Sequence, residues 1–419
     1  MRQGSCSWKT CVGIGGILLA LFPVVVQGSR PLSSWPPPIN LSENAGRSTF
    51  PAIAALNPAG DLLVLWVDYS QDSGGEVWAR AFRGGGWDPP INLSSSEGRD
   101  EGAALYADGR GRAYAAWTHR SIPGGSDLLC RRWEGGRWSP PELLEHTDTY
   151  QPTPYGLFFV SGFGPTLCLF VTMGSGIRHT CLQGETWEPL TPWVYLQGLS
   201  QVGTIVVGSD GLLHAAALGP NEDAPYGCDP WLDDAYYITS PDGISWSPPA
   251  NLTYTGTIAY DVDLAWDREG ALHFLWSDIS PRCSIDSERS AVYERVWSGG
   301  TWGPRRDVST PKEGQAVEDL ELAAGPGGML HLAWSEGVFD EDGQAVNLGI
   351  HYRRWAGGDW EEEEVVWASS ADSINVDLSL IGGIVPALVW EEGPSTAEEV
   401  YFSRRGELIR RFLPLVWRE

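Results

Sequence analysis

The sequence predicts an all-β protein, a β-propeller of four-stranded antiparallel blades, for which seven blades fit best and six are the alternative. Three observations predict it. The 419 residues include 22 Trp, 51 Gly and 30 Pro but only 3 Met, a composition typical of short strands joined by tight turns. A phrase of turn glycine, tryptophan and proline recurs every 49 to 59 residues. Between its copies lie apolar strands that end in tryptophan, and a four-strand unit of this period is typical of a propeller blade.

Each repeat is expected to supply four strands, named a to d from the centre of the ring outwards. Strands a and b are joined by turns such as 57–60 and 267–270, which contain residues that tolerate positive φ. Strand b is an apolar run after a glycine, as in 60–66 and 328–334. Strand c leads into a glycine turn before the next tryptophan, which opens strand d. The tryptophans of the recurring phrase are Trp35, Trp87, Trp138, Trp187, Trp246, Trp302 and Trp360.

Blade-on-blade packing is expected to close a ring, because one blade alone cannot bury both of its faces. We count b–c hairpins in seven successive units, the first starting near Thr49 and the last near Asn375. The third unit, residues 153–187, departs most from the repeat, which leaves six blades as the alternative. The strand after Trp35 lies ahead of the first unit and is expected to close the ring by pairing with the last blade.

The first 28 residues have the pattern of a secretory signal peptide. Arg2 and Lys9 precede an apolar stretch at 11–26, and small residues follow at a plausible cleavage site. The apolar stretch is short for a membrane-spanning helix, so a cleaved signal is favoured over a retained anchor. Residues 29–419 then form a single propeller domain, and the protein is expected to be secreted or extracellular, without stable membrane insertion after cleavage.

The net charge of −26 limits the possible partners. Nucleic-acid binding needs a basic face and is excluded on this ground. Cations, neutral glycans and basic proteins remain, and we expect a monomer whose partner is a glycan or an extracellular protein. Nothing in the sequence requires a cofactor.

The turn at 240–246, Ser-Pro-Asp-Gly-Ile-Ser-Trp, resembles the Asp box of sialidase-like (BNR-repeat) propellers, although it is one residue short between Asp242 and Gly243. The other turns keep the glycine and tryptophan and lose the aspartate, while the repeat rhythm resembles the family along the mature chain. In that family the box is a fold element remote from the active site. The resemblance therefore implies the fold, with this chain as a divergent, non-catalytic member.

A sialidase site would require, by the family's chemistry, three arginines on the substrate carboxylate, an Asp acid/base and a Tyr nucleophile activated by a Glu. The Phe/Tyr-Arg-Ile-Pro motif that carries the family's first arginine is absent. The nearest substitutes are Arg47 and Arg99 in matching d–a loops, Asp100 next to Arg99, and Tyr260 at the start of the fifth blade. The alternative is that both arginines are loop residues that pair with local carboxylates.

Acidic residues recur in strand a of the last three blades. Asp263, Glu321 and Asp377 each lie 13 residues before a strand-b tryptophan, and Asp261 and Asp319 lie two residues earlier. Strand a is innermost in a propeller, so these carboxylates are expected near the central channel, where oxygen ligands would suit Ca²⁺. The alternative is an ion pair with the arginines that recur in strand c, namely Arg80, Arg131, Arg295 and Arg353.

The b–c loops are long and mostly acidic, and they are expected on the same face as the d–a loops. Binding sites favour loops held on a rigid scaffold. The candidate binding residues are Tyr226, Trp231, Asp233, Asp234 and Asp340, whose aromatic members could stack on sugar or peptide. The alternative is a solvated acidic loop.

Two cysteine pairs are candidate disulfides in an exported protein. Cys168 and Cys181 flank the turn at 174–175 symmetrically and would face each other across the b–c hairpin. Cys228 and Cys283 lie in matching loops of neighbouring blades. Cys130 is left over and is expected to be a buried, inert thiol.

Two functional hypotheses follow. The first is an exported binding module for glycan or protein that acts through the face of the b–c and d–a loops. The second is a sialidase-type exo-glycoside hydrolase. A third arginine converging with Arg47 and Arg99 beside Tyr260 would favour the enzyme, whereas a channel mouth lined by paired arginines and carboxylates would favour binding.

Overall fold

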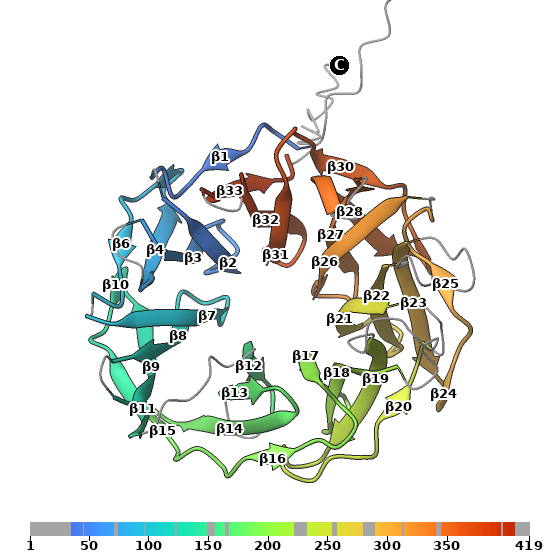
Figure 1. Ribbon diagram of the computed structural model, residues 1–419, viewed down its shortest axis with the longest axis horizontal. Helices are drawn as coiled ribbons and strands as arrows, with labels where there is room; N and C mark the ends of the chain where they lie inside the picture. The colour runs from blue at the N-terminus through green and yellow to red at the C-terminus, as the bar shows by residue number, and fades with distance from the viewer. Residues whose placement is uncertain are drawn as a thin grey trace, which may run out of the picture. The chain divides into compact units, whose positions relative to one another are not determined.

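The computed structural model describes residues 35–44, 46–70, 74–95, 97–121, 124–148, 156–163, 167–221, 233–253, 258–279, 290–311, 314–340, 345–394 and 397–406. Within these ranges the regular structure consists of β-strands, which form seven antiparallel sheets arranged around a ring (Figure 1). The prediction of an all-β propeller with seven blades is confirmed. No helix among the described residues is long and apolar enough to cross a bilayer.

The first four blades follow one another along the chain, each with strands a to d in order. Blade 1 consists of β2 (Ser48–Ala55), β3 (Leu62–Asp68), β4 (Glu76–Arg83) and β5 (Gly86–Trp87), with β6 (Ile91–Asn92) beside β4. Blade 2 consists of β7 (Arg99–Ala107), β8 (Ala113–Arg120), β9 (Ser126–Glu134) and β10 (Arg137–Trp138), with β11 (Glu142–Thr147) beside β9. Blade 3 consists of β12 (Gly156–Ser161), β13 (Leu167–Met173), β14 (Gly176–Gln183) and β15 (Thr186–Trp187), with β16 (Val194–Tyr195) beside β14. Blade 4 consists of β17 (Gln201–Val207), β18 (Leu213–Pro220), β19 (Asp233–Ser240) and β20 (Ala250–Asn251).

The last three blades include the one that joins the two ends of the propeller. Blade 5 consists of β21 (Ile258–Trp266), β22 (Leu272–Ile279), β23 (Ala291–Ser298) and β24 (Thr301–Trp302), with β25 (Arg306–Asp307) beside β23. Blade 6 consists of β26 (Gln315–Ala324), β27 (Leu330–Phe339), β28 (Ala345–Ala356) and β29 (Asp359–Trp360), with β30 (Glu364–Trp367) beside β28. Blade 7 consists of β31 (Ser373–Ile381), β32 (Val385–Glu392), β33 (Glu399–Arg404) and β1 (Ile39–Asn40).

The core lies between adjacent blades. Strand b is covered on both faces, which is why its sequence is an uninterrupted apolar run: all seven residues of β3 are buried. The cluster between blades 7 and 1, for example, combines Trp66 with Val389 and Phe402. The largest fully buried side chains are the strand-b tryptophans Trp66, Trp117, Trp276, Trp334 and Trp390.

The ring closes as the sequence predicts, because β1 pairs with β33 through Ile39 opposite Phe402 and Asn40 opposite Tyr401. Trp35 anchors the segment before β1. Its ring packs edge-on against Tyr352 of blade 6 at a centroid distance of 5.3 Å, and its indole N–H donates to Glu364 at 3.0 Å. Blade 7 is thus built from both ends of the described chain.

The predicted disulfide between Cys168 and Cys181 is confirmed. The two residues face each other in the β13–β14 ladder with their Cα atoms 4.0 Å apart. Cys130 is a free, buried cysteine, and burial raises the pKa of its thiol, as expected of an inert group. Cys228 and Cys283 lie outside the described residues.

β-Bulges interrupt the inner strands of six blades and shape the channel. The a–b ladder shifts register near the start of strand a in every blade but the third. Such bulges re-aim side chains and are common beside functional sites. The residues that the ladder skips include Phe50, Gly102, Gly203, Tyr260, Glu318 and Asn375.

Candidate functional site

The bulges expose two aromatic side chains at the end of the channel where the inner strands begin. Phe50 is 50% exposed and Tyr260 is 47% exposed, although most aromatic side chains of the protein pack between blades. Phe50 also has a positive φ of 53°, as does the equivalent bulge residue Asn375 with 51°. Non-glycine residues rarely adopt this conformation, and it is concentrated at functional sites.

Carboxylates from blades 5 to 7 lie near the same ends of the inner strands. Asp261 accepts a hydrogen bond from the backbone N–H of Leu320 at 3.0 Å, and Asp319 accepts one from Asn375 at 2.7 Å. Glu391 accepts from the Asn375 side chain at 2.6 Å and from the backbone N–H of Phe50. We call this set, together with Tyr260 and Glu318, the channel mouth.

The three hydrogen bonds donated by backbone N–H groups each join one blade to the next, whereas the bond from the Asn375 side chain to Glu391 lies within blade 7. Inner strands of neighbouring blades do not form a shared ladder, so their inward N–H groups need other acceptors. Asp263 and Asp377 act in the same way deeper in the channel, bonding the N–H groups of Leu322 and Ile53, each at 2.7 Å. Four of the five carboxylates predicted to bind calcium, all except Glu321, are therefore acceptors for a neighbouring blade.

The buried acids have raised pKa values. Burial, reinforced by the Asp319 charge, raises the pKa of Asp261 to about 7 and that of Glu318 to about 7. Burial raises the pKa of Glu391 to about 8, and it also raises the pKa values of Asp319 and Glu321. At neutral pH this end of the channel therefore contains both carboxylates and protonated carboxyl groups, which can accept and donate hydrogen bonds.

Arginines gather on blades 1 and 2. Arg47 bonds Glu398 at 2.7 Å, and its guanidinium lies 5.7 Å from the ring centre of Tyr69. Arg99 and Arg120 both pair with Glu101, the latter at 3.3 Å. The side chains of Arg47 and Arg99 are 46% and 50% exposed, so both remain accessible to solvent. The structure thus brings the two predicted arginines to adjacent blades, each paired with a carboxylate.

The other two residues proposed for a sialidase site do not join the arginines: the side chain of Asp100 is buried, and Tyr260 lies among the carboxylates of blades 5 and 6. Asp100 is fully buried, and the ring of His119 lies 3.0 Å from its carboxylate. The charges that act on Tyr260 are those of Glu318, Asp319 and Asp261, and with burial they raise the pKa of its phenol. Burial raises the pKa of Tyr69, and the charges of Arg99 and Arg47, which lower that pKa, only partly offset this effect.

Two of the five predicted loop residues, Asp233 and Asp234, are engaged in the scaffold. Asp234 is buried and accepts hydrogen bonds from Asn251 at 2.6 Å and Thr253 at 2.7 Å. Asp233 accepts from Ser200 at 2.7 Å. Asp340 is exposed. Tyr226 and Trp231 lie outside the described residues.

Sequence reasoning missed Phe50, Glu318 and Glu391, whereas the repeat identifies Asn375 as the blade 7 equivalent of Asp261 and Asp319. Their positions depend on the bulges, which the repeat alignment treats as ordinary strand. The available signals were Pro51, Gly102 and Gly203, since proline or glycine inside a strand often indicates a bulge.

One group of metal-type ligands converges among the described residues, and it differs from the predicted one. Glu336, His351 and Glu363 have ligand atoms that all lie within 4.8 Å of one another. None of the five channel carboxylates belongs to this group.

Comparisons with known proteins support the fold. No family model matches the sequence, and no curated protein matches it. A protein of unknown function from Dyadobacter fermentans is similar in structure, with a TM-score of 0.53, 11% identity, and coverage of 88% of this chain and 97% of the other. The GH93 α-L-arabinofuranosidase of Fusarium graminearum has a TM-score of 0.44 at 10% identity, covering 88% of this chain and 98% of its own. The NanB sialidase of Streptococcus pneumoniae, as its K499G mutant, has a TM-score of 0.45 at 10% identity, covering 88% and 70%. The likeness to the Dyadobacter protein shows the propeller architecture.

Proposed function

We propose that this protein is a secreted propeller that binds a glycan at the channel mouth. The observation that carries the proposal is the pair of half-exposed rings, Phe50 and Tyr260, placed by bulges among carboxyl groups and Asn375. Aromatic faces pack on the apolar faces of sugar rings, while carboxyl and amide groups hydrogen-bond the hydroxyls. A few polar groups on a rigid frame are typical of a ligand site.

Paired charges favour binding over hydrolysis of sialosides. Arg47 and Arg99 each have a carboxylate partner, which supports binding over a sialidase-type clamp on a substrate carboxylate. Burial raises the pKa of the Tyr260 phenol and the acidic groups around it raise the pKa further, so they oppose its ionisation to a nucleophile. They would also repel the carboxylate of a sialic acid.

A sialidase-type exo-glycoside hydrolase is the second candidate. The observation in its favour is Arg120, which shares Glu101 with Arg99 and adds a third arginine to the same corner of the ring. Hydrolysis of a fluorogenic sialoside by the wild-type protein, abolished in Arg99→Ala, would establish this candidate and sink the binding-only proposal.

The glycan proposal is tested by an array of neutral and acidic glycans, followed by calorimetry with the strongest ligand. Phe50→Ala and Tyr260→Ala are each expected to weaken binding at least 10-fold, because each removes a stacking face. Ile384→Ala is the matched control, since Ile384 is 60% exposed but lies in the β31–β32 turn, at the other end of an inner strand. Equal affinities in all four proteins would exclude the channel mouth as the site.

Secretion forms part of the same proposal. Residues 1–28 are expected to be removed on export, leaving a mature chain that begins near residue 29. N-terminal sequencing of the protein recovered from the medium of an expressing culture tests this. An intact N-terminus on a membrane-bound protein would favour the retained anchor.

A further inference from the structure

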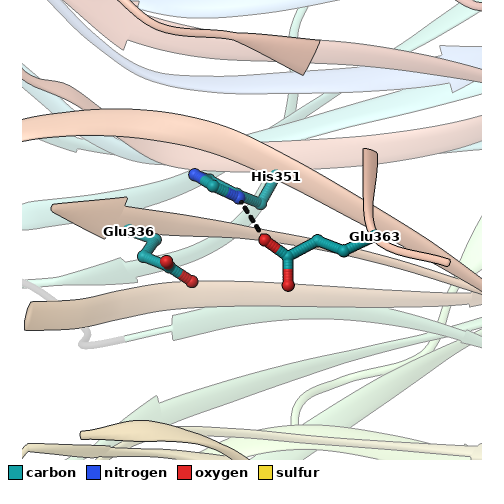
Figure 2. A group of neighbouring side chains, drawn as sticks. All are labelled: Glu336, His351 and Glu363. Atoms are coloured by element: carbon teal, nitrogen blue, oxygen red, sulfur yellow. Dashed lines mark hydrogen bonds and ion pairs between the residues drawn. The ribbon is translucent and has the colours of Figure 1, made fainter. Parts of the chain in front are cut away.

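We propose that Glu336, His351 and Glu363 form a binding site for a divalent transition-metal ion, with Zn²⁺ as the best-fitting ion. The three ligands come from β27, from β28 and from the segment that precedes β30. His351 Nδ1 lies 2.9 Å from a Glu363 carboxylate oxygen, and the ligand atoms of all three residues lie within 4.8 Å of one another. Figure 2 shows the two carboxylates pointing toward each other beside the imidazole.

The site is recessed. Glu336 is 7% exposed, and the side chains of His351 and Glu363 are 13% and 19% exposed. Two carboxylates held this close repel each other, and the repulsion is stronger away from water. A divalent cation between them would replace this repulsion with attraction, and the partial exposure of Glu363 leaves a route for the ion.

Trp334 contacts two of the ligands and orients them. Its indole N–H donates to a Glu336 carboxylate oxygen at 3.0 Å, while its ring stacks on His351 at a centroid distance of 5.6 Å and an interplanar angle of 30°. Outer partners of this kind fix the orientation of metal ligands before the ion arrives. Trp334 also belongs to the core between blades 5 and 6, so the packing around it holds its side chain in place.

Comparison among blades shows that the histidine is an addition to the repeat. The residue paired with the strand-b tryptophan is His351 in blade 6, whereas other blades have Trp78, Leu129, Tyr293 and Tyr401 there. Blade 7 keeps the tryptophan–glutamate pair, since Trp390 donates to Glu392 at 3.3 Å, but it has Tyr401 in place of the histidine. The pair is therefore a scaffold feature, and blade 6 adds a nitrogen ligand to it.

The donor set selects the metal. One imidazole nitrogen and two carboxylates suit Zn²⁺, which binds such ligands at about 2.0–2.2 Å and commonly keeps a water in its fourth position. Ca²⁺ takes six or more oxygen ligands and fits poorly. Tetrahedral coordination requires ligand atoms about 3.3 Å apart, so the three ligand atoms, which lie within 4.8 Å of one another, must move closer together when the ion binds.

The test is calorimetric titration of the untagged full-length protein with zinc chloride at neutral pH. The wild-type protein is expected to bind zinc. His351→Tyr should lower the affinity at least 100-fold, because it removes the nitrogen ligand. Tyrosine is chosen because a tyrosine ring stacks on the strand-b tryptophan in blade 7, where Tyr401 stacks on Trp390. Glu363→Gln is expected to weaken binding at least 10-fold. Acidification should also weaken it, because protons compete with the metal for all three ligands.

His146→Gln is the matched control. His146 also contacts two carboxylates, Asp127 at 2.6 Å and Asp148 at 3.1 Å, but through opposite ring nitrogens, so one ion cannot reach all three. Its loss should leave zinc affinity unchanged. Absence of binding by the wild-type protein, or equal affinity in a folded His351→Tyr variant, would overturn the proposal, and thermal unfolding curves establish that each variant is folded.

Discussion

Two carboxylates in this protein have opposite pKa shifts for distinct physical reasons. Asp242 is exposed and accepts hydrogen bonds from the backbone N–H groups of Ser245 and Ile244, which lower its pKa to about 2. Glu391 is 1% exposed, and loss of hydration raises its pKa to about 8 despite the bonds that it accepts. The hydrogen bonds therefore decide the direction of the pKa shift at Asp242, whereas at Glu391 the loss of hydration outweighs them.

The raised pKa values predict that the protein becomes less stable as pH rises from about 5 to 8. A raised pKa in the folded state means that the folded protein binds more protons than the unfolded chain in this range, so stability is lost as pH rises through the folded pKa. Glu391→Gln is expected to reduce this loss, visible as a smaller difference between the melting temperatures at pH 5 and pH 8. Glu362→Gln is the exposed control. If Glu391→Gln has the same difference between its melting temperatures at pH 5 and pH 8 as the wild-type protein, the role of burial at Glu391 is contradicted.

At the scale of elements, the turn at 240–246 shows what an isolated Asp box does. Ser240 accepts the N–H of Gly243 at 2.9 Å, Asp242 accepts those of Ile244 and Ser245, and the Trp246 indole donates to the Gly243 carbonyl at 3.2 Å. The turn lies between β19 and β20, level with the end of the inner strand β17, because Ser240 pairs with Leu213 and Leu213 pairs with Val207. Its role is to hold the turn shape that blades 1, 2, 5 and 6 obtain from paired glycines, as at Gly84 and Gly85, whose φ values are 59° and 88°.

Asp242→Ala is therefore expected to lower the melting temperature by a few degrees without changing ligand binding, because it removes acceptors for two backbone donors. Scanning calorimetry beside the glycan-binding assay measures both. Asp359→Ala in the equivalent turn of blade 6 should lower the melting temperature less, because Asp359 accepts the backbone N–H of Trp360 whereas Asp242 accepts two backbone N–H groups. Equal losses in the two variants would argue against the box as the stabilising feature.

The disulfide of blade 3 is a second stabilising element. Cys168 and Cys181 are separated by 13 positions, and a loop of this size contributes roughly 3 kcal/mol in chain-entropy models. The double variant Cys168→Ala/Cys181→Ala should lower the melting temperature well beyond the effect of Cys130→Ala, which truncates a buried thiol without breaking a crosslink. Similar losses in both would show that packing, and not the crosslink, stabilises this blade.

The sequence was sufficient to predict the blades but only part of the candidate site. Tryptophans and turn glycines recur because each blade meets the same packing problem, so their spacing reveals the strand order and even the Cys168–Cys181 register. The convergence of Glu336 with His351 and Glu363 follows from strand pairing, which ligand spacing along the chain does not report. The buried carboxylates were expected near the channel, yet their use as acceptors for the next blade depends on bulges that the repeat conceals.

At the scale of the whole molecule, ring closure predicts the effect of removing the first strand. A chain that begins after Leu41 lacks β1 and the buried side chains of Trp35 and Leu41, each of which contributes roughly 1.5–3 kcal/mol through burial. It also exposes the edge of β33, to which other chains can pair. We expect a lower melting temperature and higher-order species in size-exclusion chromatography with light scattering. A chain that begins at residue 29 is the control, and a monomeric, equally stable truncation would contradict the closing role of β1.

The same pairing has a consequence for the order of folding. Ile39 meets Phe402 across more than 300 intervening residues, so this contact forms only when the last blade has been synthesised. Blades 1 to 6 consist of strands close together along the chain and can assemble as they emerge. The first strand must wait unpaired throughout, and translation that stops before Glu399 leaves a ring that cannot close. Completion of synthesis is therefore the step that commits this protein to its native state.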